Sequence, residues 1–387
     1  MRLERMKERF EKLYGSGGEV FAYHSPGRVN LIGEHTDYNG GYVLPCALTL
    51  GTCGIIRKRE NRLLRFASTN IGGAYIEIGL DQIEYNREHS WVNYLLGVVA
   101  EFQNLGLPVG GLELLLSGDM SSNAGLSSSA SVEMLMAAAL NELFETKLET
   151  IELVKLAQRA ENRFVGVNCG IMDQYAVGMG KKDRAMLLDC TSLACEYIPV
   201  EPDGHCLIIG NTNSPRNLAG SGYNTRREEC ERAVKMLRSG HEITLLGQLT
   251  PAQFETDKHR ITCPTARKRA THVIYEIERT KQAAEHLRAG NLAAFGELMN
   301  QSHRSLAGLF EVTGKALDTM VNAAWKQEGV LGSRMTGAGF GGCTVSLVKE
   351  SCAGAFIENV GKIYKEETGI EAAFYTAGIG EGTRRIG

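Results

Sequence analysis

The spacing of hydrophobic and polar positions along the chain predicts a mixture of strands and helices. Near the start, apolar residues recur every three or four positions, which is typical of a helix over residues 1–14; they are Leu3, Met6, Phe10 and Leu13. A strand-rich stretch punctuated by glycines follows to about residue 90. Beyond it we expect a short helix over residues 92–102 and an apolar strand over residues 112–116.

Two longer helices are predicted next along the chain. Residues 129–143 are rich in Ala, Met and Leu and contain neither Gly nor Pro, which favours a helix. Residues 150–164 form the second, with Thr150 as its candidate N-cap. The last part of the chain is predicted to hold helices over residues 221–238, 267–288 and 312–328, and short strands near residues 341–348 and 371–378.

The length of the chain predicts two domains. A chain of 387 residues exceeds what one hydrophobic core comfortably holds. Residues 196–206 include two prolines and a glycine and form the best boundary, which divides the chain into residues 1–198 and residues 205–387. Because both halves combine strands with long helices, we expect an α+β fold.

Composition and charge exclude several classes of function. The formal net charge is −3 and no basic run occurs, so we expect neither nucleic acid nor a membrane as a partner, and no obligate protein partner is evident. The ten cysteines form no CxxC pair, which argues against a zinc site or a disulfide framework. The charged residues 1–12 differ from a secretory signal, and no stretch approaches the roughly 20 apolar residues of a membrane span. We therefore expect a cytoplasmic protein.

The first polar cluster spans residues 25–41, where charged and amide side chains stand between glycines. Glu34, His35 and Asp37 offer hydrogen-bond acceptors and a switchable donor within four positions, as a polyhydroxylated ligand requires. Arg28 adds a fixed cation suited to phosphate or to a developing oxyanion. The alternative is a solvated surface loop, but the density of polar groups favours a binding site.

The second cluster, residues 123–131, runs directly into the predicted helix over residues 129–143. A glycine followed by serines at a helix N-terminus is typical of an anion site, because free backbone N–H groups and hydroxyl donors converge there. The alternative is N-capping by Ser127 or Ser128. Four serines within five positions are more than a cap requires, and a serine hydroxyl could also ligate Mg²⁺.

The third cluster, residues 335–343, contains the spacing GxGxxG. That fingerprint must open a helix in a dinucleotide site, whereas the residues after Gly342 are typical of a strand. We therefore expect a strand–loop–strand element. It is either a tight hairpin or a place where backbone closely approaches another loop or a ligand.

Two carboxylates outside these clusters are candidates for chemistry. Asp173 lies in an apolar stretch near Gly170, a setting that calls for a buried structural role or for catalysis. Glu161, taken alone, is typical of a surface charge. No Walker P-loop occurs in the sequence, so any phosphate chemistry must use a different loop.

Taken together, the three clusters resemble the signature motifs of the GHMP kinase superfamily, and the first is similar to the galactokinase signature within it. Residues 168–174 and 223–230 also resemble that branch, so the similarity spans about residues 20 to 348. The resemblance implies a two-domain α+β GHMP-kinase fold with the active site in the interdomain cleft. It also implies phosphorylation of the anomeric hydroxyl of galactose by ATP, with Mg²⁺.

The resemblance assigns a role to each matching residue. Asp173 corresponds to the catalytic aspartate, which takes or orients the proton of the sugar O1, and Arg28 to the arginine that stabilises the transferring phosphoryl group. The sugar-contacting positions are Glu34, His35, Asp37, Gly170 and Tyr223. The ATP-binding phosphate loop is Gly125, Leu126, Ser127, Ser128 and Ser129. The Mg²⁺ ligands are Ser129 and Glu161, and the glycine-rich loop contributes Gly337, Gly339, Gly341 and Gly342.

The chain departs from the family pattern in two loops. The phosphate loop usually begins Pro-x-Gly, whereas Ser121 and Asn123 stand here, and Asn tolerates the left-handed backbone better than most residues. Near Tyr223, Gly220 and Gly222 replace the common Asp and Lys, which puts the sugar contacts in question.

Two alternatives stand beside a galactose kinase. One is a kinase for a related sugar such as N-acetylgalactosamine or arabinose. The other is a non-catalytic sensor of galactose and ATP. The complete serine run of the second cluster, with Asp173 and Arg28 both present, favours catalysis.

Overall fold

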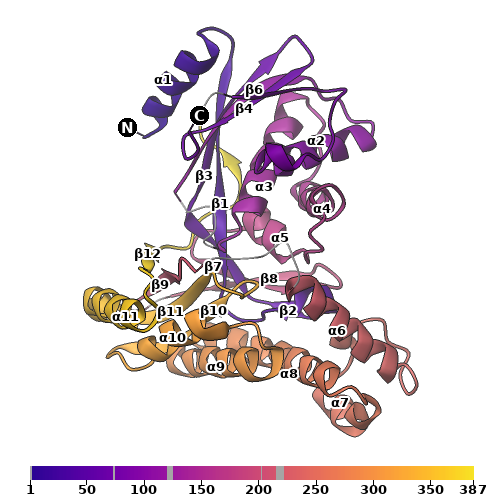
Figure 1. Ribbon diagram of the computed structural model, residues 1–387, viewed down its shortest axis with the longest axis vertical. Coiled ribbons are helices and arrows are strands. Elements are labelled where there is room, and N and C mark those ends of the chain that lie inside the picture. Colours follow the sequence, from indigo (N-terminus) through magenta and orange to yellow (C-terminus); the bar gives the residue numbers. More distant parts are fainter. Residues whose placement is uncertain (1, 73–74, 120–124, 202, 215–221) are drawn as a thin grey trace.

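The computed structural model describes residues 2–72, 75–119, 125–201, 203–214 and 222–387, so Ser121, Asn123 and Gly220 lie outside the described residues (Figure 1). The described helices are α1 (Arg2–Tyr14), α2 (Val92–Asn104), α3 (Ser128–Leu143), α4 (Thr150–Ala160), α5 (Met172–Met179), α6 (Gly222–Leu237), α7 (Pro251–Asp257), α8 (Pro264–Arg288), α9 (Leu292–Ser305), α10 (Gly314–Ala324) and α11 (Ala353–Thr368). The described strands are β1 (Val20–Asn30), β2 (Tyr42–Val43), β3 (Pro45–Arg59), β4 (Leu63–Ser68), β5 (Ile76–Gly79), β6 (Gly111–Gly118), β7 (Arg184–Asp189), β8 (Cys195–Pro199), β9 (His205–Asn211), β10 (Val330–Thr336), β11 (Cys343–Lys349), β12 (Ala373–Ala377) and β13 (Arg384–Arg385).

A six-stranded sheet in the order β13-β1-β3-β6-β4-β5 carries helices on both faces. Figure 1 shows α1 on one side of this sheet and α2 to α5 on the other. The alternation of side chains along the strands explains the two layers. Ile55 and Leu115 pack with Phe10 of α1, whereas Ile56 and Leu114 belong to the larger core beneath α2 to α5.

The second half of the chain builds a four-stranded sheet in the order β10-β11-β9-β12, with α8 to α11 gathered beside it (Figure 1). A three-stranded sheet, β2-β7-β8, contacts α8. The last strand, β13, returns to the first sheet and pairs with β1, so that Tyr23 lies opposite Arg385.

Most predicted elements are confirmed, among them the helices over residues 1–14, 92–102 and 129–143. The prediction for residues 150–164 is wrong in two respects. Glu149, which has an extended backbone, occupies the N-cap position, so Thr150 is already the first helical residue. The α-helix also stops at Ala160 and continues as one π-helical turn, Glu161–Val165.

Two further expectations concern the whole chain. All ten cysteines lie in the described residues and are free thiols, in agreement with the expected lack of a disulfide framework. Within the described ranges, no helix combines the length and the apolar character that a membrane span needs.

Candidate active site

One cavity of about 600 Å³ gathers most of the predicted site residues from both halves of the chain. The predicted residues that line it are Arg28, Glu34, His35, Asp37, Gly125, Ser127, Ser128, Ser129, Glu161, Gly170, Asp173, Tyr223 and Gly337. Leu126, Gly339, Gly341 and Gly342 are not among the lining residues. The side chain of Leu126 is buried in a hydrophobic core, while its carbonyl oxygen accepts a hydrogen bond from the backbone N–H of Arg28 at 3.1 Å.

A bidentate ion pair between Arg28 and Asp173 lies in this cavity. Arg28 Nε donates to Asp173 Oδ1 and Nη2 to Oδ2, both at 2.7 Å, and Nη1 donates to the carbonyl oxygen of Gly125 at 3.0 Å. Burial alone would lower the pKa of Arg28, but the Asp173 carboxylate outweighs it and the pKa is raised. The pair therefore joins β1, the phosphate loop and α5 through one fixed positive charge.

Ser127 precedes α3, and its side chain bonds to Asp173 in the cavity instead of capping the helix. Its backbone is left-handed, with φ 59°, and its side chain makes no capping hydrogen bond, so N-capping by Ser127 is wrong. The hydroxyl instead donates to Asp173 Oδ2 at 2.5 Å. Ser128 and Ser129 follow in the first turn of α3 and also line the cavity, so the positive end of this helix faces it.

Ser129 and Glu161, the predicted metal ligands, are brought together. Glu161 belongs to the π-helical turn after α4 and is only 7% exposed, so the surface-charge alternative is wrong. Its carboxylate accepts hydrogen bonds from the Ser129 side chain and from Gln174 Nε2, the latter at 2.6 Å. Burial, followed by the negative charge of Asp173, raises the pKa of Glu161 to about 7.

Asp37 and Gly170 touch at the polar end of the cavity. A Cβ atom on Gly170 would lie 1.8 Å from Asp37 Oδ2, so only glycine permits this approach. Burial, followed by the charge of Asp173, raises the pKa of Asp37 to about 6. Tyr223 of α6 joins the pair, because its hydroxyl hydrogen-bonds to the backbone of Gly170.

Glu34 and His35 tie the first cluster to the glycine-rich loop. Glu34 pairs with Arg334 of β10 and accepts a hydrogen bond from the Gly337 N–H at 3.0 Å. His35 lies 2.8 Å from the Tyr38 hydroxyl and 3.2 Å from the carbonyl oxygen of Ala338. A carbonyl only accepts, so Nε2 carries the proton, and burial lowers the pKa of His35 to about 3, which keeps the ring neutral.

The glycine-rich loop forms a hairpin and also closely approaches the phosphate loop. It joins β10 to the antiparallel β11, which confirms the strand–loop–strand prediction. Gly337, Gly339, Gly341 and Gly342 all have positive φ angles, between 78° and 97°. A Cβ on Gly337 would lie 3.3 Å from the Gly125 carbonyl oxygen, so this loop packs directly against the phosphate loop.

The structure adds residues that the sequence pattern did not reveal. The apolar part of the cavity is lined by Ile71, Trp91, Tyr94, Leu116, Val132 and Val167. These come from separate elements and carry no common motif. Arg334 is fully buried and donates to the carbonyl oxygens of Asn30 and Leu31 as well as to Glu34.

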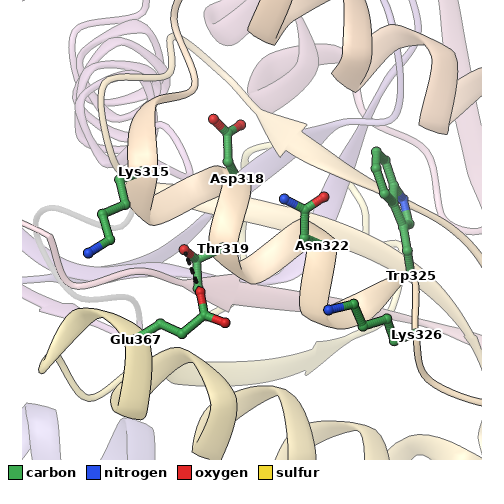
Figure 2. A pocket seen from close by; sticks show the side chains of 7 residues that line it. All are labelled: Lys315, Asp318, Thr319, Asn322, Trp325, Lys326 and Glu367. Atoms are coloured by element: carbon green, nitrogen blue, oxygen red, sulfur yellow. Dashed lines mark hydrogen bonds between the residues drawn. The ribbon is translucent and has the colours of Figure 1, made fainter.

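A second hollow, of about 570 Å³, lies beside α10 and α11, and none of the predicted site residues line it. Figure 2 shows Asp318 and Trp325 pointing to one side of α10, while Thr319 points toward Glu367 of α11 on the other side. Thr319 and Glu367 are joined by a hydrogen bond of 3.4 Å. The first cavity, which is lined by most of the predicted site residues, is therefore the candidate active site.

Comparison with known families agrees with this geometry. Residues 8–58 match the galactokinase galactose-binding signature, residues 93–181 the GHMP kinase N-terminal domain, and residues 283–366 the GHMP kinase C-terminal domain. The first of these contains Arg28 and the polar residues after it, and the second contains the phosphate loop and Asp173.

Similar proteins extend along the whole chain. A galactokinase of Fusobacterium nucleatum is 50% identical over 99% of this chain and all of its own length, and one of Bacillus subtilis is 49% identical over 99% of both chains. The crystal structure of Lactococcus lactis galactokinase complexed with galactose covers all of both chains at a TM-score of 0.97 and 44% identity. A mevalonate kinase structure, at a TM-score of 0.65 and 18% identity, shares the fold over 94% of this chain and 99% of its own. The chain has the GHMP kinase fold and belongs to the galactokinase family.

Proposed function

We propose that the chain transfers the γ-phosphate of ATP to the anomeric hydroxyl, O1, of D-galactose, giving galactose 1-phosphate and ADP. The observation that carries this proposal is the bidentate pair between the buried Arg28 and the half-buried Asp173, which lies between a polar end and a phosphate loop in one cavity. The Lactococcus lactis galactokinase, which covers this whole chain at 44% identity, was crystallised in complex with galactose, and this supports the choice of sugar.

The polar end of the cavity suits a sugar. Asp37 and the Tyr223 hydroxyl can accept or donate hydrogen bonds to sugar hydroxyl groups, and Gly170 leaves room for the Asp37 carboxylate. Glu34 lines the same end but is only 1% exposed and is paired with Arg334. His35 is engaged through both ring nitrogens, so we assign its ring the task of positioning this end rather than of exchanging protons.

The other end suits a nucleotide. The N-terminus of α3 presents Ser128 and Ser129 to the cavity, where backbone N–H groups and the helix dipole favour phosphates. Trp91 and Tyr94 lie in the apolar part of the same cavity and offer aromatic surface to an adenine ring.

The residues present also fit a magnesium ion. Ser129 and Glu161 supply a hydroxyl and a carboxylate oxygen, the donor type that Mg²⁺ prefers, and they lie at the phosphate end. When bound, the ion would neutralise charge on the β- and γ-phosphates. The raised pKa of the buried Glu161 suits a carboxylate that is charged in the presence of a cation.

In the reaction a bond forms between O1 and the γ-phosphorus, and the bond from that phosphorus to the bridging oxygen of ADP breaks. Among the hydrogen bonds of the described residues, Asp173 Oδ1 accepts only from Arg28 Nε, so it retains room for the O1–H. Asp173 orients O1 and takes its proton, while Arg28 stabilises the charge that spreads over the transferring group. Positioning of these groups supplies most of the catalysis.

The domain division and the location in the cell belong to the same proposal. We assign residues 1–198 and 205–387 to two domains, with sugar and ATP bound in the cleft between them. We also propose that the protein works in the cytoplasm, which suits its ten free thiols.

The test is a coupled assay of ADP release with Mg-ATP and a panel of galactose, glucose, N-acetylgalactosamine and arabinose. We expect selective turnover of galactose and its loss in Asp173→Asn, with the melting temperature little changed. Turnover of another sugar would assign a different substrate. Binding of galactose and ATP without any turnover would identify a sensor instead of a kinase.

A further inference from the structure

Glu133 is a buried carboxylate that the proposed mechanism does not use. It lies on α3 one turn beyond Ser129 and is completely inaccessible to solvent. Glu113, which is equally buried, pairs with Arg57, Arg59 and Arg65, whereas no ion pair between described residues involves Glu133. A buried acid without a cation is costly and calls for a reason.

Gln174 connects Glu133 to the proposed metal site. Its amide nitrogen, Nε2, donates to Glu133 Oε2 at 3.0 Å and to Glu161 Oε2 at 2.6 Å. The two N–H groups of one amide therefore bridge two carboxyl groups, which also contact each other directly. Glu133 Oε1 and Gln174 Oε1 are buried without a hydrogen-bond partner in the described structure. Unpaired buried polar atoms lower the free energy of unfolding, so this arrangement is not the one that stabilises the fold most.

The bridge joins the three segments that carry the proposed chemistry. Glu133 belongs to the helix that starts at the phosphate loop, and Gln174 follows Asp173 in α5. Glu161 lies on the π-helical turn after α4, a distortion that occurs frequently at functional sites. Without Gln174, the Glu161 carboxylate would lose its hydrogen bond of 2.6 Å and would keep only the Ser129 side chain and the longer contact of 3.6 Å from Cys169 Sγ.

We infer that Glu133 and Gln174 are positioning residues: Glu133 orients the Gln174 amide, and that amide holds the Glu161 carboxylate in the direction that binds Mg²⁺. The inference rests on the proposed metal role of Glu161. Partners of this kind around a metal ligand typically change metal affinity by about 10- to 100-fold when they are removed.

The experiment compares binding of Mn·AMPPNP with binding of metal-free AMPPNP. Water-proton relaxation measures the first, because Mn²⁺ held on the slowly tumbling protein enhances relaxation, and calorimetry in EDTA measures the second. Gln174→Met removes the donor and Glu133→Met removes the acceptor, each with nearly the same volume. Each should weaken Mn·AMPPNP binding about tenfold and leave the Kd of metal-free AMPPNP and the KM for galactose unchanged.

Three further variants separate positioning from general damage. Glu133→Gln keeps an acceptor for the Gln174 amide and should rescue Mn·AMPPNP binding. The Glu133→Met, Gln174→Met double variant should bind no more weakly than either single one, because both residues act through one bridge. Leu140→Ala removes core volume from the same helix, so it should lower the melting temperature without selective loss of Mn·AMPPNP.

The outcomes are distinguishable. If Gln174→Met binds Mn·AMPPNP as tightly as the unmodified protein, or loses metal-free AMPPNP equally, the positioning role is wrong. Should Glu133→Met fail to fold, Gln174→Met and Glu133→Gln decide the question alone. If the unmodified protein itself prefers Mn·AMPPNP no more than AMPPNP, the proposed metal role of Glu161 fails, and the inference falls with it.

Discussion

Replacing Gly170 with alanine places a methyl group where the Asp37 carboxylate lies. The added Cβ would be 1.8 Å from Asp37 Oδ2 and 2.3 Å from Cγ, far inside van der Waals contact. The backbone of Gly170 is not left-handed, so alanine fits its conformation and the effect comes from this contact alone.

The size of the effect follows from how far the Asp37 carboxylate must move. The contact can be relieved only if the carboxylate moves by more than an ångström, and it is held by backbone N–H groups, including that of Met172. A displacement of about 1 Å at a reacting centre can cost about 100-fold in rate, which corresponds to roughly 2.7 kcal/mol of transition-state stabilisation. We therefore expect kcat/KM for galactose to fall about 100-fold in Gly170→Ala.

Steady-state kinetics with galactose varied at saturating Mg-ATP measure the loss, and the KM for ATP should stay nearly constant. Gly354→Ala is the matched control, because a Cβ there meets nothing within 4 Å and its backbone is also compatible with alanine. If Gly170→Ala retained the kcat/KM of this control, the assignment of Asp37 and Gly170 to the sugar end would be refuted.

Three other perturbations follow from the geometry. The pKa of Asp37 is raised to about 6, so protonation below that pH removes the negative charge of this acceptor. We therefore expect kcat/KM for galactose to fall as the pH drops through 6. A pH profile of Asp37→Asn should lack this inflection. Ser127→Ala removes a hydrogen bond to the Asp173 carboxylate but no helix cap, so kcat should fall by about tenfold or more while the urea midpoint barely moves; a stability loss without a kcat loss would restore the capping role. Arg334→Met leaves Glu34 buried without its cation and should cost about 3–5 kcal/mol in urea unfolding; an unchanged midpoint would show that the pair is dispensable.

The sequence predicted best where a local pattern determines the structure. The helix over residues 129–143 follows from its Ala, Met and Leu content, and the loop before it follows from glycine and serine chemistry. The polar cluster that contains Arg28 and Asp37 was also recognisable, because so many polar groups stand between glycines. These features require no knowledge of distant contacts.

The rest depends on contacts between distant segments. Helix α9 was not predicted, although Phe295, Leu298 and Met299 recur at helical spacing and are buried, so this helix could have been found from its pattern. Glu161 continues the buried face of α4 one turn after Ala157, but its carboxyl group is held by Ser129 and Gln174 from other segments, which the sequence around it does not reveal. Trp91 and Tyr94 line the same cavity as the phosphate loop because α2 packs beside α3.

The most direct test of the central claim is the site of phosphorylation. The purified protein is incubated with Mg-ATP and galactose, and the product is analysed by proton and phosphorus NMR. We predict phosphate on O1, seen as phosphorus coupling to the anomeric proton, and none in Asp173→Asn. Phosphate on another hydroxyl, or the same product in Asp173→Asn, would contradict the proposed chemistry.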